Sequence, residues 1–316
     1  MLAKLKKPAV CILLIAPFFG ESLSGATPPL DLILPWNLAL MVGLYGCGAL
    51  ICREVVLKYK LGLVGLIVLG AAYGVWEEGL VDRYWYDPSF WDDQNIGAYS
   101  VVGQTNLLLA LLLTVFHSAV SICCSVLVVE QIFPKRQAQP WIGRRGMIVA
   151  VVVFAVVVPL VCGEFYWPSA PNLVAAALVM AGLVAVAFWQ RRFAFKARIE
   201  LPSPGRSRKA IGWIAFAATL IFWFTVYGLP ESGIAWPVGL LIAALPVVIA
   251  VWLITRRATG DRFGSDALRV ITGILGFFVL LDLFIAPLAR PDMLLSALAV
   301  VLLLRWLWRQ EPSLES

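Results

Sequence analysis

Two adjacent glutamates and a histidine are the residues of this chain best suited to chemistry. Glu77 and Glu78 lie at the end of an apolar segment, residues 61–80, and His117 lies inside the next long one, residues 105–132. A carboxyl group held beside a second one in apolar surroundings is a candidate general acid, general base or proton carrier. A nearby imidazole could orient a water molecule or stabilise an oxyanion. We therefore take Glu77, Glu78 and His117 as the candidate catalytic residues.

Other polar residues could face the same site. At 100° per residue, Gly74, Glu78 and Asp82 share one face of a helix. The helix with the histidine carries a polar stripe over about 120° of its circumference, made of Asn106, Thr114, His117, Ser118, Ser121, Cys124 and Ser125. Such a stripe is expected to face the interior of a helix bundle or a water-filled cavity. With Glu21, near the outer end of the first apolar segment, the candidate binding residues are Glu21, Asp82, Asn106, Ser118 and Ser121.

The sequence predicts no metal ion and no other cofactor. A metal ion could take Glu77, Glu78 and His117 as ligands, but a single histidine excludes most familiar zinc ligand sets. The six cysteines form no CxxC pair and no zinc-ligand cluster. They lie in or next to apolar segments, as small buried hydrophobic residues do.

The elements that must position these residues are membrane-spanning helices. Of the 316 residues, 61% are hydrophobic and 14% are charged, whereas a soluble domain carries roughly 25% charged residues. The mean hydropathy is +0.88. This composition excludes a water-soluble enzyme, a disordered protein and a small secreted domain stabilised by disulfides. Because lipid does not tolerate unpaired backbone polar groups, the chain is predicted to be an all-α polytopic transmembrane helix bundle.

About ten segments approach the ~20 apolar residues that a helix needs to cross the hydrocarbon core. They are residues 8–24, 35–57, 61–80, 105–132, 147–163, 172–189, 210–229, 236–255, 267–288 and 292–308. The first segment also resembles a secretory signal, because lysines precede it and Ser24, Gly25 and Ala26 follow it. Cleavage there would remove the first span. Pro17 and Gly20 favour instead a retained, irregular first helix.

The basic residues predict the orientation of the bundle. With both termini in the cytoplasm, every Lys and Arg except Arg83 and Arg290 falls on the cytoplasmic side, as the positive-inside rule requires. The expected location is the plasma (inner) membrane of a prokaryote. The cytoplasmic segment 191–209 is strongly basic and could bind anionic lipid head groups. The formal net charge of +6 is explained by such loops, so no nucleic-acid partner is expected.

Charge within the membrane is distributed unevenly along the chain. Residues 1–132, the first four helices, contain Glu21, Arg53, Glu54, Glu77, Glu78, His117 and Glu130. Residues 133–316, helices five to ten, contain one clear intramembrane candidate, Asp282. Because charge at membrane depth is costly and typically functional, we expect the first part to carry the function and the second to be an apolar scaffold. No loop is long enough for a soluble domain.

The glutamate pair followed by a histidine on the next helix resembles the CAAX-processing and bacteriocin-processing family of membrane glutamic proteases. In that family a Glu-Glu-x-x-x-Arg motif and two histidines activate water, which implies a catalytic role for Glu77, Glu78 and His117. Asp82 stands at the arginine position, Arg83 follows one residue late, and the chain has no second histidine. The pair also lies near the outer face, whereas those enzymes work from the cytoplasmic side.

The layout as a whole resembles an uncharacterised set of prokaryotic polytopic membrane proteins. That set shares Gly-Glu, Arg-Glu and Glu-Glu-Gly-Leu segments with this chain. The resemblance implies a helix bundle in the membrane and supplies no mechanism.

Three functions remain open at this point. The first is a carrier for a small or amphipathic solute, in which intramembrane Glu and His residues shuttle protons. The second is a membrane-embedded hydrolase, in which Glu78 or Glu77 is the general base, His117 assists, and Ser121 or Asn106 supports them. The third is a non-catalytic scaffold that holds a protein partner or a lipid. The expected partners are membrane lipids, a small or amphipathic solute and, for a scaffold, another protein.

Overall fold

The computed structural model describes residues 7–161, 166–191, 208–257, 266–286, 288 and 290–310, and about four fifths of them are helical. Cys162 and most of the basic segment 191–209 lie outside the described residues, so the expectations for them stay predictions. The chain is an all-α polytopic bundle, as its composition indicates.

Helices follow one another with short connections. The first half contains α1 (Lys7–Pro17), η2 (Phe18–Ser22), α2 (Pro29–Leu32), α3 (Pro35–Met41), η3 (Val42–Gly46), α4 (Cys47–Tyr59), α5 (Gly62–Trp76), η4 (Glu77–Val81), η5 (Tyr84–Tyr86), α6 (Pro88–Asp93), α7 (Leu107–Phe116), η6 (His117–Cys124) and α8 (Ser125–Ile132). The second half contains η7 (Pro134–Arg136), α9 (Arg144–Val152), η8 (Val153–Val157), α10 (Val158–Val161), α11 (Ala170–Trp189), α13 (Arg208–Gly228), α14 (Trp236–Arg257), α15 (Ala267–Ile285) and α16 (Met293–Gln310). The described strands are β1 (Val101–Val102) and β2 (Thr105–Asn106), an antiparallel pair.

Nine helices of the described part have the length and apolar composition to cross a membrane. They are Pro35–Tyr59, Gly62–Val81, Leu107–Ile132, Arg144–Val161, Ala170–Trp189, Ala210–Gly228, Trp236–Arg256, Ala267–Ile285 and Met293–Gln310. They match all but the first of the expected segments.

The first expected span, residues 8–24, is present as a helix that ends at Ser22, two residues earlier than the sequence indicates. It consists of the 11 residues of α1 and the 5 residues of η2. The helix ends because the Ser24 hydroxyl donates to the carbonyls of Gly20 and Glu21, and because the chain turns at Gly25, whose φ is +82°.

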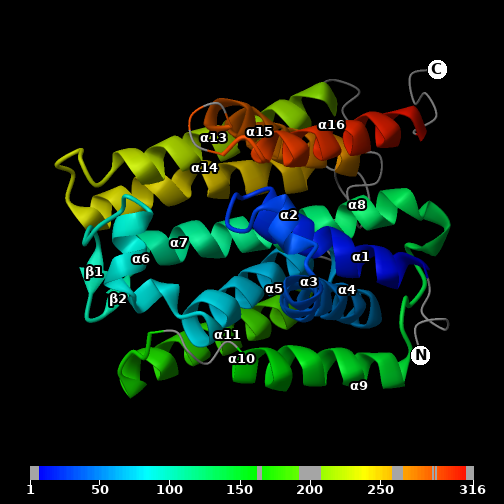
Figure 1. Ribbon diagram of the computed structural model, residues 1–316, viewed down its shortest axis with the longest axis horizontal. Helices are drawn as coiled ribbons and strands as arrows, with labels where there is room; N and C mark the ends of the chain where they lie inside the picture. Colours follow the sequence, from blue (N-terminus) through cyan, green and yellow to red (C-terminus); the bar gives the residue numbers. More distant parts are fainter. Residues whose placement is uncertain are drawn as a thin grey trace.

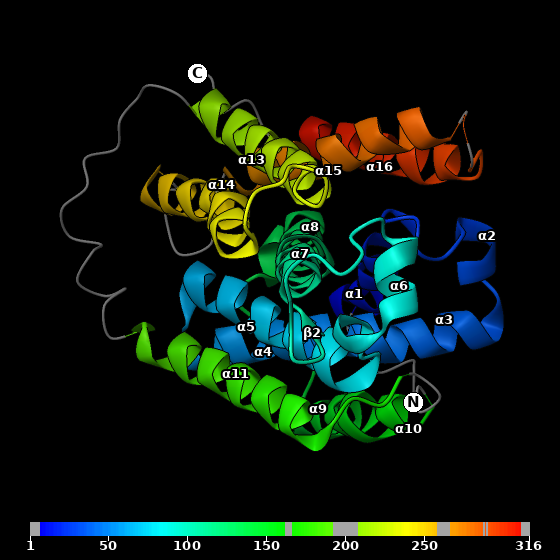
Figure 2. The ribbon, with the colours of Figure 1, turned by 90° about the vertical axis from the view of Figure 1, so that its left-hand side faces the viewer.

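The helices form layers around one central helix. In Figure 2 the continuous helix α7–η6–α8 lies in the middle, α13 to α16 lie above it, and α9 to α11 lie below α4 and α5. α15 packs against η6 and α8, and α11 packs along α5. The start of α1 and the end of α16 lie at the same end of the bundle, opposite the end that carries β1, β2 and α6 (Figure 1). We call the latter the hairpin end.

Five segments of the described helices are π-helical: η2, η3, η4, η6 and η8. π-Helical residues make up well under about 1% of soluble proteins. A π-helical segment adds a residue to a helical turn and is frequently found at a functional site. Four of the five segments lie in the first half of the chain, so the residues that they carry are candidates for a functional site.

Glycines of α5 let it lie close to the central helix. A Cβ atom added to Gly70 would lie 3.0 Å from Ser118 Cα, and one added to Gly74 would lie 3.2 Å from His117 Cβ. Gly70 and Gly74, four residues apart, therefore form a small-residue contact that lets the two helices approach closely. It brings the end of α5 next to the start of η6.

We expect Gly74→Ala to destabilise the protein by about 1–3 kcal/mol, because the added methyl group presses on the backbone beside His117. Thermal unfolding in detergent, followed by tryptophan fluorescence, would measure the effect. Gly182→Ala in α11 is the matched control, because nothing lies within 4 Å of that added Cβ. An equal loss of stability in both variants would show that the close approach is not responsible.

Candidate functional site

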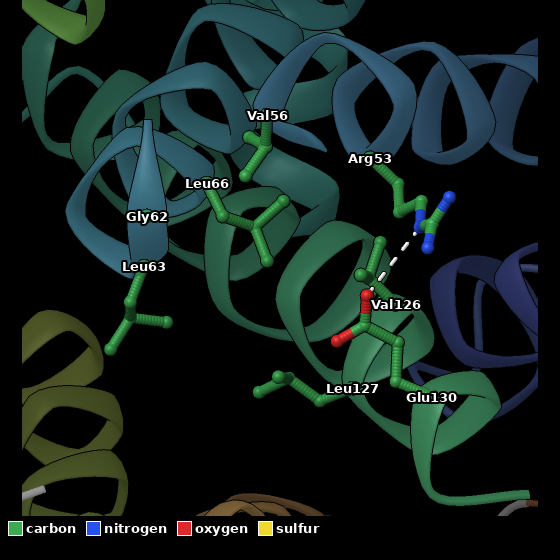
Figure 3. Close-up of a pocket in the computed structure, with 8 residues that line it drawn as sticks. All are labelled: Arg53, Val56, Gly62, Leu63, Leu66, Val126, Leu127 and Glu130. Carbon is green, nitrogen blue, oxygen red and sulfur yellow. Dashed lines mark hydrogen bonds and ion pairs between the residues drawn. The ribbon is translucent and has the colours of Figure 1, made fainter. Parts of the chain in front are cut away.

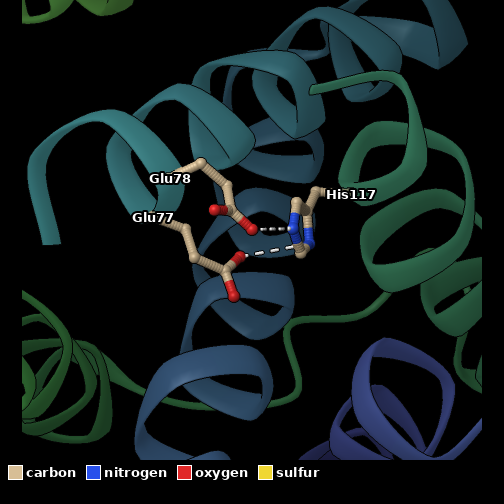
Figure 4. A group of neighbouring side chains, drawn as sticks. All are labelled: Glu77, Glu78 and His117. Carbon is tan, nitrogen blue, oxygen red and sulfur yellow. Dashed lines mark hydrogen bonds and ion pairs between the residues drawn. The ribbon is translucent and has the colours of Figure 1, made fainter. Parts of the chain in front are cut away.

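The glutamate pair and the histidine meet in the protein interior. Glu78 Oε1 lies 2.8 Å from His117 Nε2, and Glu77 Oε2 lies 3.1 Å from His117 Nδ1 (Figure 4). Glu77, Glu78 and His117 are 0%, 4% and 2% exposed. Each ring nitrogen therefore faces a carboxylate, and the three side chains form one buried cluster, which we call the Glu-His triad.

π-Helical turns supply every member of the triad. Glu77 and Glu78 open η4, and His117 opens η6. A π-helical turn holds more residues than an α-helical turn, so consecutive side chains are separated by a smaller angle around the axis. This geometry lets two adjacent glutamates point at one imidazole.

A ring of polar and aromatic side chains surrounds the triad. Ser121 Oγ lies 3.0 Å from His117 Nδ1. The Tyr45 ring stacks on the imidazole at a centroid distance of 5.9 Å, and its hydroxyl donates to Glu21 Oε1 at 2.8 Å. The Tyr73 ring meets the imidazole edge-on at 6.0 Å. Glu21 and Tyr45 themselves belong to η2 and η3, so four π-helical segments converge here.

The triad carries an imbalance of charge. Within the described residues, the ion pairs of Glu77 and Glu78 are with His117 alone. Both oxygens of Glu77 and Oε2 of Glu78 are buried without a hydrogen-bond partner in this part of the chain. An imidazolium can balance one carboxylate but not two. Because unpaired buried charge is costly, the site needs a further proton or a bound cation.

Two more carboxyl groups lie near the triad. Glu21 reaches it through the Tyr45 hydroxyl, and its second oxygen accepts a 2.5 Å hydrogen bond from Thr27. Asp82 follows η4 and is 9% exposed. Burial raises the pKa of the Asp82 carboxyl well above its usual range, and the charges of Glu78 and Glu21 raise it further. The surroundings of the triad are therefore acidic.

The remaining candidate binding residues serve the backbone. The Ser118 hydroxyl donates to the Ile67 carbonyl at 2.7 Å and ties the central helix to α5. Asn106 caps the start of α7 by accepting from Leu109 N, and its amide donates to the Gly97 carbonyl. Among the predicted binding residues, Ser121 is the one in direct contact with the imidazole.

Comparison with known proteins places this chain among membrane proteins. A family model matches residues 10–312, which include every site residue described above. The chain belongs to an uncharacterized membrane protein family. No curated protein and no solved structure matches it. For this family member, chemical roles therefore have to be argued from the site itself.

The membrane protein has a second buried charge cluster, which ties down a connecting segment. Arg53 Nη1 lies 2.6 Å from Glu54 Oε1, and Arg53 Nε lies 3.4 Å from Glu130 Oε1. Figure 3 shows Arg53 and Glu130 facing each other beside apolar side chains. The guanidinium also lies 3.9 Å from the Trp141 ring centroid and donates to the carbonyls of residues 137 and 139. Its contacts fasten the segment after α8, so we assign this cluster a structural role.

Tyr45 and Tyr73 contact the triad but are not among the site residues predicted from the sequence. Each lies within an apolar helix and beside a glycine, and a tyrosine in such a segment needs a partner for its hydroxyl. The need of each hydroxyl for a hydrogen-bond partner could have identified both tyrosines from the sequence. Asp282 on α15 is also buried, and its carboxylate oxygens have no hydrogen-bond partner within the described residues.

Contact within the triad predicts energetic coupling. Glu78→Gln and His117→Gln should not act independently on stability: the double variant should differ from the sum of the two single variants by a coupling of about 0.5–3 kcal/mol. Denaturant unfolding of the four proteins in detergent would measure this cycle. The control pairs His117→Gln with Glu130→Gln, which lies about 20 Å along the same helix and should add within about 0.5 kcal/mol. Additivity of the Glu78 pair would contradict the contact.

Proposed function

We propose that this multi-pass membrane protein is a carrier for a small solute that binds at the Glu-His triad. The observation that carries this proposal is an occluded site in which carboxyl groups outnumber basic groups. Two carboxylates share one imidazole, and the three side chains are at most 4% exposed. Such a site suits a small cationic solute that enters when the surrounding helices move.

The position of the triad supports the same function. Glu77 and Glu78 lie in the last turn of the Gly62–Val81 span, and His117 lies within the Leu107–Ile132 span. A buried polar site between spans is a common place for a substrate in membrane transport. A hydrolase that acts on a polymer or a lipid would need a path wide enough to bring that substrate to the triad, whereas a small cation needs only a narrow one.

We also propose that the bundle lies in the plasma membrane of a prokaryote, with the hairpin end outside. The distribution of Lys and Arg supports this orientation. In that case the triad is closer to the outer face, and uptake from outside is the natural direction.

The orientation predicts which loops a membrane-impermeant maleimide reaches in intact cells. Asp93→Cys, at an exposed residue of α6, should react readily, because the hairpin end faces outward. Ala138→Cys, exposed after α8, should react only after the membrane is opened. The unsubstituted chain gives the background of its six native cysteines. The opposite pattern would reverse the orientation.

The carrier proposal predicts cation flux in proteoliposomes. Uptake of labelled sodium, rubidium, methylammonium and manganese would be compared with that of protein-free vesicles. At least one of these cations should enter severalfold faster with the protein, and Glu78→Gln should remove the excess, because it removes one of the two negative charges. Glu231→Gln, at an exposed residue between α13 and α14, is the matched control and should leave the flux unchanged.

Two results would contradict this proposal, one for the carrier function and one for the position of the site. Correctly folded protein, shown by cooperative thermal unfolding, that moves none of these cations faster than empty vesicles is not a cation carrier. Flux that Glu78→Gln leaves intact would place the solute site elsewhere.

A further inference from the structure

We propose that Glu77, Glu78 and His117 bind one divalent transition-metal ion, such as Zn²⁺ or Mn²⁺. That this ion is the transported solute rests on the carrier function proposed above. That the ion binds at the triad rests on the geometry of the three residues. One ligand atom from each residue lies within 4.8 Å of the others.

The distances in the triad are close to those of a metal site. Ligand atoms about 2.1 Å from a tetrahedral ion lie roughly 3.4 Å from one another. Glu78 Oε1 lies 2.8 Å from Nε2 and Glu77 Oε2 lies 3.1 Å from Nδ1, and a single ion can bind only one of these two ring nitrogens. An ion at Nε2 has Glu78 beside it, and Glu77 has to turn away from Nδ1 to reach the ion. The ligand atoms of all three residues already lie within 4.8 Å of one another.

The charge and the donor atoms select the kind of ion. Two carboxylates balance the charge of a divalent ion, and burial favours this neutral combination. An imidazole nitrogen with two carboxylate oxygens suits Zn²⁺, Mn²⁺ or Fe²⁺, whereas Mg²⁺ and Ca²⁺ prefer oxygen ligands alone. No thiolate is among the three ligands, so the soft ion Cu⁺ is not favoured.

Unsatisfied atoms point to the same ligand. The buried carboxylate oxygens of Glu77 and Oε2 of Glu78 have no hydrogen-bond partner within the described residues, and neither does the hydroxyl of Tyr73. Buried polar atoms are normally satisfied by protein, water or an ion. A metal ion between the carboxylates would bind the carboxylate oxygens that the imidazole does not contact.

The surroundings of His117 fit a metal-binding histidine. Such a histidine typically uses one ring nitrogen for the metal and the other for a hydrogen bond that fixes the ring. Ser121 Oγ lies 3.0 Å from Nδ1 and can accept its proton. Nε2 is then free to bind the ion beside Glu78, and the Tyr45 ring holds the imidazole plane by stacking.

Three protein ligands also favour exchange over permanent retention. A structural zinc site usually has four protein ligands, whereas three leave a position for water or for an incoming ligand. Glu21 lies next to the triad through the Tyr45 hydroxyl and supplies a further carboxyl group beside the site. An ion that has to be taken up and released is better served by this arrangement than by a closed site.

The test is a titration of the purified full-length protein in detergent, stripped with a chelator, with Zn²⁺, Mn²⁺ and Co²⁺ alone. Calorimetry should give one ion per chain, and the Co²⁺ absorption spectrum should report its coordination. Glu78→Gln and His117→Gln should weaken binding by more than the roughly 10–100-fold that loss of an outer partner costs. Thr219→Ala on α13, which likewise removes a hydroxyl bonded to a backbone carbonyl, is the matched control and should bind normally.

A second measurement needs no variant. Saturating Zn²⁺ should raise the Tm of the wild-type protein, because a ligand that binds only the folded state stabilises it. Mg²⁺ at the same concentration should leave Tm nearly unchanged.

The outcomes separate this proposal from the carrier function. Absence of binding and of any Tm shift, or binding that survives both Glu78→Gln and His117→Gln, would overturn the metal site. Monovalent cation uptake that depends on Glu78 would then still support a carrier. Stoichiometric metal binding without flux would leave the site in place and refute the carrier.

Discussion

The rest of the structure depends on one constraint. Two carboxyl groups share one imidazole in the buried interior of the bundle. Glu77 and Glu78 are buried in the low-dielectric interior, and one imidazolium can balance the charge of only one ionised carboxylate. Such an arrangement is stable only if the surrounding helices hold the three groups together and if something positive completes the balance. Neither of the neighbouring acidic residues, Glu21 and Asp82, supplies positive charge.

The helices around the triad can be understood as a response to this constraint. Gly70 and Gly74 remove side chains where α5 meets the central helix, so that the glutamates and the histidine come within hydrogen-bond distance. The Arg53 cluster also has two carboxylates and one cation, but its side chains have more partners: Arg53 pairs with Glu54 and Glu130, Trp141 N donates to Glu54, and the guanidinium also donates to backbone carbonyls. The two buried charge clusters therefore differ in how many of their carboxylate oxygens have a hydrogen-bond partner within the described residues.

The sequence predicted the helical class and nine of the spans found in the described part, because hydropathy is a local property. It placed the end of the first helix two residues too late, because hydropathy does not register the turn that follows Ser22. It named Glu77, Glu78 and His117 as candidates but did not predict their contact, which depends on how the helices pack. It also could not predict that both ring nitrogens face carboxylates, since that depends on π-helical turns whose positions no local pattern revealed. Tyr45 escaped notice for the same reason: its partner Glu21 comes from another helix. The expectation of no metal followed from counting histidines and stays a prediction, and the metal site proposed above follows instead from the arrangement of the carboxylates.

The convergence of η2, η3, η4 and η6 has a mechanical consequence. If one of these wide turns tightened to an α-helical turn, the helix beyond it would screw by about 100° and shift by about 1.5 Å. Because four helices change their winding around the triad, such a slip could turn a ligand away from its partners while the helices stay in contact. Access to the buried site would then be governed by the winding of individual helices, with no need for two halves of the molecule to swing apart.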